Sequence, residues 1–104
     1  MKARWILIAL SAVALPAAAQ ATDLSRLEAI LLDAQNDKVT ISADAWRVSG
    51  NEAVTLANRI KGGSAAKNLR MHVREMRDAA LKGDAAGART HASEALPFAE
   101  QLEK

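Results

Sequence analysis

Two histidines give this chain its most distinctive chemistry, because both stand in the same short pattern. Residues 70–75 and 89–94 each read Arg-x-His-x-x-Glu, which places His72 and His91 19 positions apart. On a helix, the glutamate lies one turn beyond the histidine, so each pattern presents an imidazole next to a carboxylate. Imidazole and carboxylate groups together are typical of hydrogen-bonded pairs, transition-metal sites and acid–base catalysis.

The separation of the two patterns also predicts that they meet. In an antiparallel hairpin that turns at Gly83, His72 lies at the level of Glu94, and His91 lies at the level of Glu75. The two histidines are then offset by about 4.5 Å along the helix axis, at 1.5 Å per residue. We therefore expect one mixed imidazole and carboxylate cluster between two neighbouring helices.

Three interpretations of this cluster remain open. Each imidazole can hydrogen-bond a carboxylate across the hairpin and fix the register of the helices. Alternatively, His72, His91 and Met76, together with Glu75 or Glu94, hold a soft transition metal such as copper. A catalytic acid–base pair is the third interpretation, but no nucleophile or convergent set of donors accompanies it. We therefore expect binding without catalysis.

The elements that must position this cluster are helices. Capping residues predict helices that begin at Thr22-Asp23, Ser42, Ser64 and Asp84 and that end near Asn36, Lys61, Gly83 and the chain terminus. Their apolar stripes are Leu24, Leu27, Ile30, Leu31 and Ala34; Trp46, Gly50, Ala53, Ala57 and Ile60; Ala66, Leu69, Val73, Met76 and Ala80; and Ala88, Ala92, Ala95, Ala99 and Leu102. The segment Val39-Thr40-Ile41 is expected to be an extended connector, and Pro97 is expected to kink the last helix.

Apolar spacing of 3.5 residues and short connections favour antiparallel packing of sequence neighbours. The predicted fold is therefore all-α, an up-down-up-down antiparallel four-helix bundle over residues 22–104. The alternative is a pair of helical hairpins that completes its core by dimerising, because a small, alanine-rich chain without disulfides buries little apolar area.

The first 21 residues have the pattern of an export signal. Lys2 and Arg4 precede an apolar run of 11 residues, and Ala19-Gln20-Ala21 fits a small-x-small cleavage site before Thr22. The run is too short to cross about 30 Å of hydrocarbon as a helix. We therefore expect residues 1–21 to be a cleaved signal peptide and the remaining domain to be periplasmic or secreted.

Charge and composition exclude several classes of function. The chain has 14 Lys and Arg against 12 Asp and Glu, and removal of Lys2 and Arg4 leaves equal numbers, which argues against a nucleic-acid partner. The absence of cysteine excludes thiol catalysis and covalent haem attachment. Residues 47–82 nevertheless carry an excess of basic side chains. They predict either helices of opposite charge packed together, or a face for a protein partner or self-association around Arg59, Arg70, Arg74 and Arg77.

Residues 83–99 resemble part of a known family. Gly83-Asp84 followed by residues 88–96, Ala-Arg-Thr-His-Ala-Ser-Glu-Ala-Leu, is similar to the repeated hairpin of small periplasmic metal-binding proteins, which are histidine-rich four-helix bundles. The resemblance implies a metal-sequestering role in which His91 matches a family histidine. Asp84, Pro97 and Phe98 stand where that family has histidines, so high-capacity metal binding is not expected.

Overall fold

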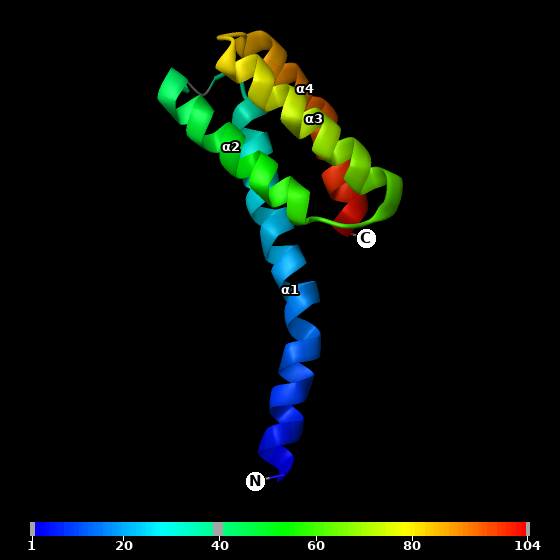
Figure 1. Cartoon of the computed structure of the whole chain (residues 1–104). Coiled ribbons are helices and arrows are strands. Elements are labelled where there is room, and N and C mark those ends of the chain that lie inside the picture. Colours follow the sequence, from blue (N-terminus) through cyan, green and yellow to red (C-terminus); the bar gives the residue numbers. More distant parts are fainter. Residues whose placement is uncertain (1, 39–40, 104) are drawn as a thin grey trace.

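The computed structural model describes residues 2–38 and 41–103, and within these ranges it describes side chains from residue 19 onward. Over those residues the chain forms four helices and no strand: α1 (Lys2–Gln35), α2 (Ala43–Arg59), α3 (Gly63–Leu81) and α4 (Ala85–Glu103). The N-terminal half of α1 extends beyond the other three helices, which gather around its C-terminal half (Figure 1). The all-helical prediction is confirmed.

Two of the predicted caps are present. The Ser42 hydroxyl accepts a hydrogen bond from the backbone N–H of Ala45 at 3.2 Å, which starts α2. A carboxylate oxygen of Asp84 accepts the N–H of Gly87 at 2.9 Å at the start of α4. Between α3 and α4, Gly83 has φ +80°, a left-handed conformation that favours glycine and lets the chain reverse.

Two predicted helix starts are wrong. The first helix does not begin at Thr22-Asp23, because α1 runs without interruption from Lys2. The alanine-rich residues 17–21 favour helix strongly and continue it through that point. Ser64 is not the cap of α3, which begins at Gly63 with Gly62 in the cap position and no side-chain cap bond.

The end of α2, where the connection to α3 begins, also differs from the prediction. α2 ends at Arg59 rather than Lys61, and the following Ile60 is extended and fully buried. Burial of Ile60 thus ends the helix two residues early. Positive φ angles at Gly62 and Gly63 then complete the turn without a capping side chain.

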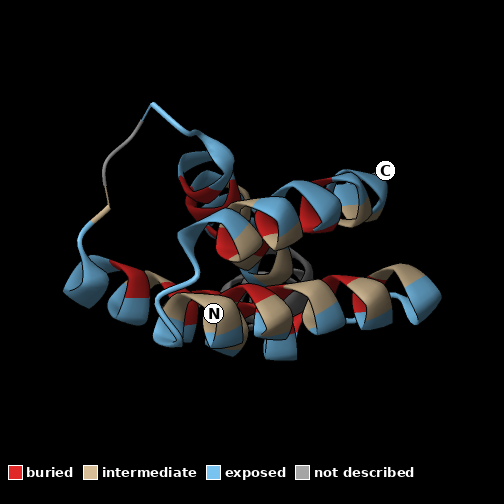
Figure 2. Cartoon of the chain, turned by 90° about the horizontal axis from the view of Figure 1, so that it is seen from above, coloured by how far each residue is buried: buried red, intermediate tan, exposed pale blue. Residues whose placement is uncertain are grey.

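The helices bury the predicted stripes. The backbone of α1 lies beside α2 and α4, and that of α3 lies beside the same two helices, with the most extensive packing between α3 and α4. Buried residues line the faces where the helices meet (Figure 2). The largest fully buried side chains are Leu27, Leu31, Ile60, Leu69, Val73 and Met76. Leu56 and Leu96 are also buried, whereas Ala80 and Leu102 are partly buried at the edge of the core.

The remaining local predictions fall on the connector and the last helix. Val39 and Thr40 lie outside the described residues, and Ile41 is non-helical and partly buried against the core. α4 stays a single helix through Pro97, which is exposed. Among the helices that the structure describes, none combines the length and the apolar run needed to cross a membrane.

Candidate metal centre

The hairpin of α3 and α4 brings the two Arg-x-His-x-x-Glu patterns together. One ligand atom each from His72 on α3 and from His91 and Glu94 on α4 lie within 4.8 Å of one another. The predicted reversal at Gly83 places these groups on facing helices, and both histidine side chains lie at the edge of the core rather than in solvent. The expected convergence of imidazole and carboxylate groups is present.

Aromatic packing orients the imidazole of His72. Its ring lies 5.7 Å from the ring of Phe98, centroid to centroid, with an interplanar angle of 11°, which is a stacked arrangement. The rings of His72 and His91 are 6.2 Å apart and tilted by 30°. Phe98, which lies on α4, therefore restricts rotation of the His72 ring.

Both histidines carry a buried nitrogen without a hydrogen bond. Nδ1 of His91 lies 3.0 Å from Oε2 of Glu75 and 3.4 Å from Oε1 of Glu94, distances of ion pairs when the ring is protonated. Neither approach has the direction of a hydrogen bond, so Nδ1 of His91, like Nδ1 of His72, has no hydrogen-bond partner among the described residues. A buried polar atom without a partner costs about 1–3 kcal/mol, which a bound metal ion would offset.

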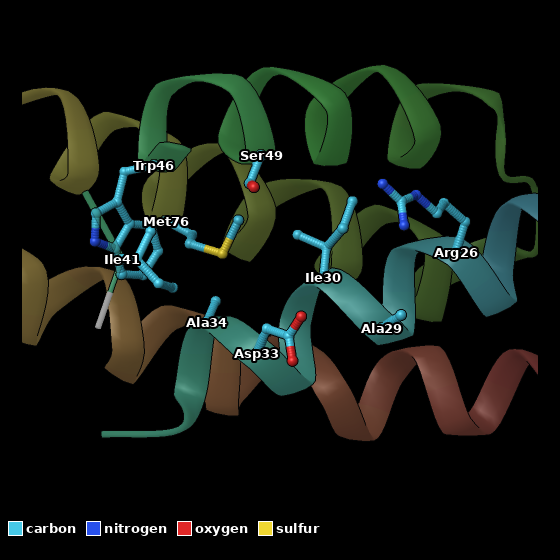
Figure 3. Close-up of a pocket in the computed structure, with 9 residues that line it drawn as sticks. All are labelled: Arg26, Ala29, Ile30, Asp33, Ala34, Ile41, Trp46, Ser49 and Met76. Atoms are coloured by element: carbon cyan, nitrogen blue, oxygen red, sulfur yellow. The ribbon is translucent and has the colours of Figure 1, made fainter. Parts of the chain in front are cut away.

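Met76 is placed differently from the other predicted ligands. Its side chain is fully buried in the core, where it lines a pocket together with Ile41 and Trp46 (Figure 3). Glu75, by contrast, is partly exposed and lies beside His91. The described cluster therefore offers two imidazoles and two carboxylates, and the thioether of Met76 takes part in core packing.

Each arginine of the expected basic face has a partner within the chain. Arg59 pairs with Asp23 at 3.6 Å, which links α2 to α1. The guanidinium of Arg70 donates to the carbonyl of Ile60 at 2.7 Å and closes the turn between α2 and α3. The other two members of the face, Arg74 and Arg77, donate to Asn58 and Asp78. Of these contacts, the pair of Arg59 with Asp23 joins two helices of opposite charge, whereas Arg77 pairs with its neighbour on α3.

One titratable group was missed by the sequence analysis. Glu28 on α1 lies beside the carboxyl group of Glu103 on α4, with Glu100 nearby, and its Oε1 is buried without a hydrogen-bond partner among the described residues. Burial first, and then these two carboxylates, raise the pKa of Glu28 to about 7. Because Glu28 follows the stripe residue Leu27, the sequence could have placed it at the edge of the core. It could not have shown the neighbouring carboxylates, because these come from a distant segment, α4.

The cluster between α3 and α4 is suited to holding a cation. Imidazole nitrogen and carboxylate oxygen are ligands for zinc and divalent copper, and they approach these ions at about 2.0–2.2 Å. One ligand atom each of His72, His91 and Glu94 already lie within 4.8 Å of one another. Comparisons of the chain with protein-family models, with curated proteins and with solved structures give no match.

Proposed function

We propose that this protein binds one divalent transition-metal ion, preferentially Cu²⁺, between α3 and α4, and that it works by binding without catalysis. The observation that carries the proposal is the convergence of His72, His91 and Glu94 within 4.8 Å, with two buried Nδ1 atoms that lack hydrogen bonds in the described protein. Glu75, next to His91, supplies the fourth ligand, which is the second carboxylate oxygen of the set. Such a site has a capacity of one ion per chain.

The nature of the ligands supports copper as the ion. Two imidazoles and two carboxylates form a mixed nitrogen and oxygen set, which suits Cu²⁺ and Zn²⁺. For a given set of this kind, Cu²⁺ binds more tightly than Zn²⁺. The thioether of Met76, which would favour reduced copper, is assigned to the core because its side chain is fully buried.

The site belongs to an exported domain in this proposal. Residues 1–21 are a signal peptide that is cleaved between Ala21 and Thr22, and residues 22–104 form an up-down-up-down antiparallel bundle in the periplasm or outside the cell. Lys2 and Arg4, the apolar run and the small-x-small residues support the export signal. The mass of the exported protein tests it, because a chain that begins at Thr22 is expected and an intact N-terminus would contradict export with cleavage.

Metal titration of the full chain tests the site. We expect Cu²⁺ to raise the melting temperature with a stoichiometry of one, and Zn²⁺ to raise it less, because a ligand of the folded state stabilises that state. The electron paramagnetic resonance spectrum of the Cu²⁺ form should show nitrogen ligands. His72→Gln and His91→Gln should each weaken Cu²⁺ binding at least about tenfold, since each removes a ligand.

A matched pair of glutamates separates the site from unspecific binding. Glu94→Gln should weaken Cu²⁺ binding about tenfold. Glu52→Gln should leave the affinity unchanged, because Glu52 pairs with Arg26 on another part of the molecule. Equal affinities of all four variants and the parent chain, or a spectrum without nitrogen ligands, would overturn the proposal.

A further inference from the structure

Another pocket lies at the end of the bundle where α3 turns into α4, and it has a volume of about 210 Å³. We call it the end pocket. The helices α2, α3 and α4, the turn between α3 and α4, and the segment before α2 supply its lining residues, which are Ile41, Ala43, Trp46, Ala80, Gly83 and Ala85. Ala43, Gly83 and Ala85 are exposed, so the pocket opens to solvent, whereas Trp46 is buried.

Trp46 brings a polar group to the end pocket. The residue is 5% exposed, and among the described residues nothing accepts a hydrogen bond from its indole N–H. A buried indole N–H usually has such a partner. Figure 3 shows the indole nitrogen on the side of the ring away from Met76. A ligand in the end pocket, which Trp46 lines, would supply the missing acceptor.

The rest of the lining favours an apolar, uncharged ligand. Ile41 and Ala80 are partly buried and offer only hydrocarbon, and no lining residue is charged. An ion would lose hydration there without meeting a counter-ion. The guanidinium of Arg89 lies 6.0 Å from the centroid of the Trp46 ring, but it donates to the Asn36 carbonyl at 2.6 Å and does not line the pocket. Apolar surface with a well-placed polar group is typical of small-molecule sites.

We propose that the end pocket binds a small neutral molecule that has an apolar ring or chain and one carbonyl oxygen. The carbonyl oxygen accepts the hydrogen bond of the Trp46 indole N–H, and the hydrocarbon part lies against Ile41 and Ala80. This inference is independent of the proposed metal site, because no residue of the histidine cluster except His91's helix neighbours on α4 and α3 shares an element with the pocket, and none of the cluster lines it.

The volume limits the size of the ligand. A cavity of about 150 Å³ accommodates benzene, so a pocket of about 210 Å³ accommodates a molecule of about eight non-hydrogen atoms. 4-Methylcyclohexanone has this size and a single carbonyl oxygen. Ethylbenzene has the same size and no oxygen. A ligand with so few atoms should bind with a dissociation constant on the order of a millimolar.

Nuclear magnetic resonance of the full chain in the presence of a metal chelator tests the proposal, with 4-methylcyclohexanone as the probe. The indole proton signal of Trp46 is identified by its absence from the spectrum of Trp46→Phe. We expect this signal to shift downfield and to saturate, because the proton forms a hydrogen bond to the ketone. Cyclohexanecarboxylate, a charged molecule of similar size, should bind at least about threefold more weakly than the ketone.

Trp46→Phe also isolates the contribution of the donor, since it keeps an aromatic ring and removes the N–H. The methyl signals of Ile41 report binding in this variant. The affinity for the ketone should fall about twofold to tenfold relative to the affinity for ethylbenzene, because only the ketone loses a hydrogen bond. Equal changes in the affinities for the two probes would overturn the proposal.

Two alanines of α4 provide the matched comparison for the location. Ala85→Leu enlarges a lining side chain and should weaken binding of the ketone at least about fivefold, because it fills part of the pocket. Ala86→Leu, at the next exposed position, should change the affinity less than about twofold, since Ala86 does not line the pocket. The absence of a saturable shift, binding of the carboxylate as tight as that of the ketone, or equal effects of the two leucine substitutions would contradict the proposal.

Discussion

Nδ1 of His91 lies 3.0 Å from Oε2 of Glu75, across the seam between α4 and α3. The two residues are 16 positions apart in sequence, and the turn at Gly83 brings them level. Since Glu94 approaches the same nitrogen at 3.4 Å, carboxylates from both helices surround one imidazole. An imidazole and two carboxylates are groups that ligate divalent metal ions.

The burial of Met76 predicts that its sulfur is not a metal ligand. Met76→Leu should leave the affinity for Cu²⁺ unchanged within about twofold, and it should lower the free energy of unfolding by less than about 1.5 kcal/mol, because the volume is conserved. Calorimetric titration with Cu²⁺ and thermal unfolding measure the two quantities. A loss of Cu²⁺ affinity comparable to that of His91→Gln would restore Met76 to the ligand set.

The stacking of Phe98 on His72 predicts a positioning role for Phe98. Phe98→Leu keeps an apolar side chain but removes the parallel ring 5.7 Å from the imidazole. An aromatic pair contributes about 0.5–1.5 kcal/mol, so the affinity for Cu²⁺ should fall about twofold to tenfold if that energy holds His72 in place. The spectrum of bound Cu²⁺ should still show nitrogen ligands. An unchanged affinity would show that the stacking serves packing alone.

The carboxyl pair between α1 and α4 predicts that stability falls as the pH rises. The pKa of Glu28 is about 7 in the folded chain, above its ordinary 4.5, so the folded state binds more protons between these values. The free energy of unfolding should therefore decrease from about pH 4.5 to pH 7, by an amount on the order of 1–2 kcal/mol for a partly exposed group.

A substitution isolates this effect from other titrations. Glu28→Gln should flatten the decrease because it removes the titrating group, whereas Glu103→Gln should flatten it only in part, because burial, the largest cause of the raised pKa of Glu28, remains. Glu52→Gln serves as the control, since Arg26 lowers the pKa of Glu52 through a hydrogen bond and its contribution is lost as the pH falls instead. Denaturant unfolding at several pH values measures the slopes, and an identical slope in Glu28→Gln would contradict the assignment.

The contacts around the expected cleavage position predict that the folded chain resists cutting there. The bond between Ala21 and Thr22 lies within α1, where the Gln20 amide donates to the Lys61 carbonyl at 2.9 Å and Leu24 is buried. Proteases act on extended backbone, so an elastase-type enzyme should cut after Ala21 much faster in urea than in buffer. Mass spectrometry of the fragments measures the rate.

Two leucines of α1 give the comparison for this prediction. Leu24→Ala removes a side chain that is 4% exposed and should speed cutting after Ala21 at least about tenfold, since it loosens the helix locally. Leu32→Ala removes a side chain that is 51% exposed and should have little effect. Equal rates for the folded parent chain and the chain in urea would show that the segment is already open.

The sequence was sufficient to predict the helices and most of the core. The stripe from Ala66 to Met76 is buried as its spacing indicates, and Ser42 caps its helix as predicted. The predicted helix boundaries were wrong at two places. Ile60 is extended and buried instead of helical, and α3 begins at Gly62 and Gly63 without the predicted serine cap. Helix periodicity and cap chemistry depend on residues that are close together in the chain, so they can be recognised in a single sequence.

The candidate metal site was predicted in part for the same reason. The repeated pattern and the short turn at Gly83 fixed the levels of His72, His91 and the two glutamates, since a hairpin relates levels by counting residues. Level does not fix the direction of a side chain, and Met76 belongs to the core although it lies near the same level.

Contacts between segments distant in sequence were decided by the tertiary structure. The pairing of Glu28 with Glu103 joins the first and last helices, and the end pocket needs three helices at once. Such neighbours depend on how the helices rotate and approach each other as the whole core packs. The sequence by itself therefore determined the helices and the level of each group along them, and the packing of the helices decided which groups face one another.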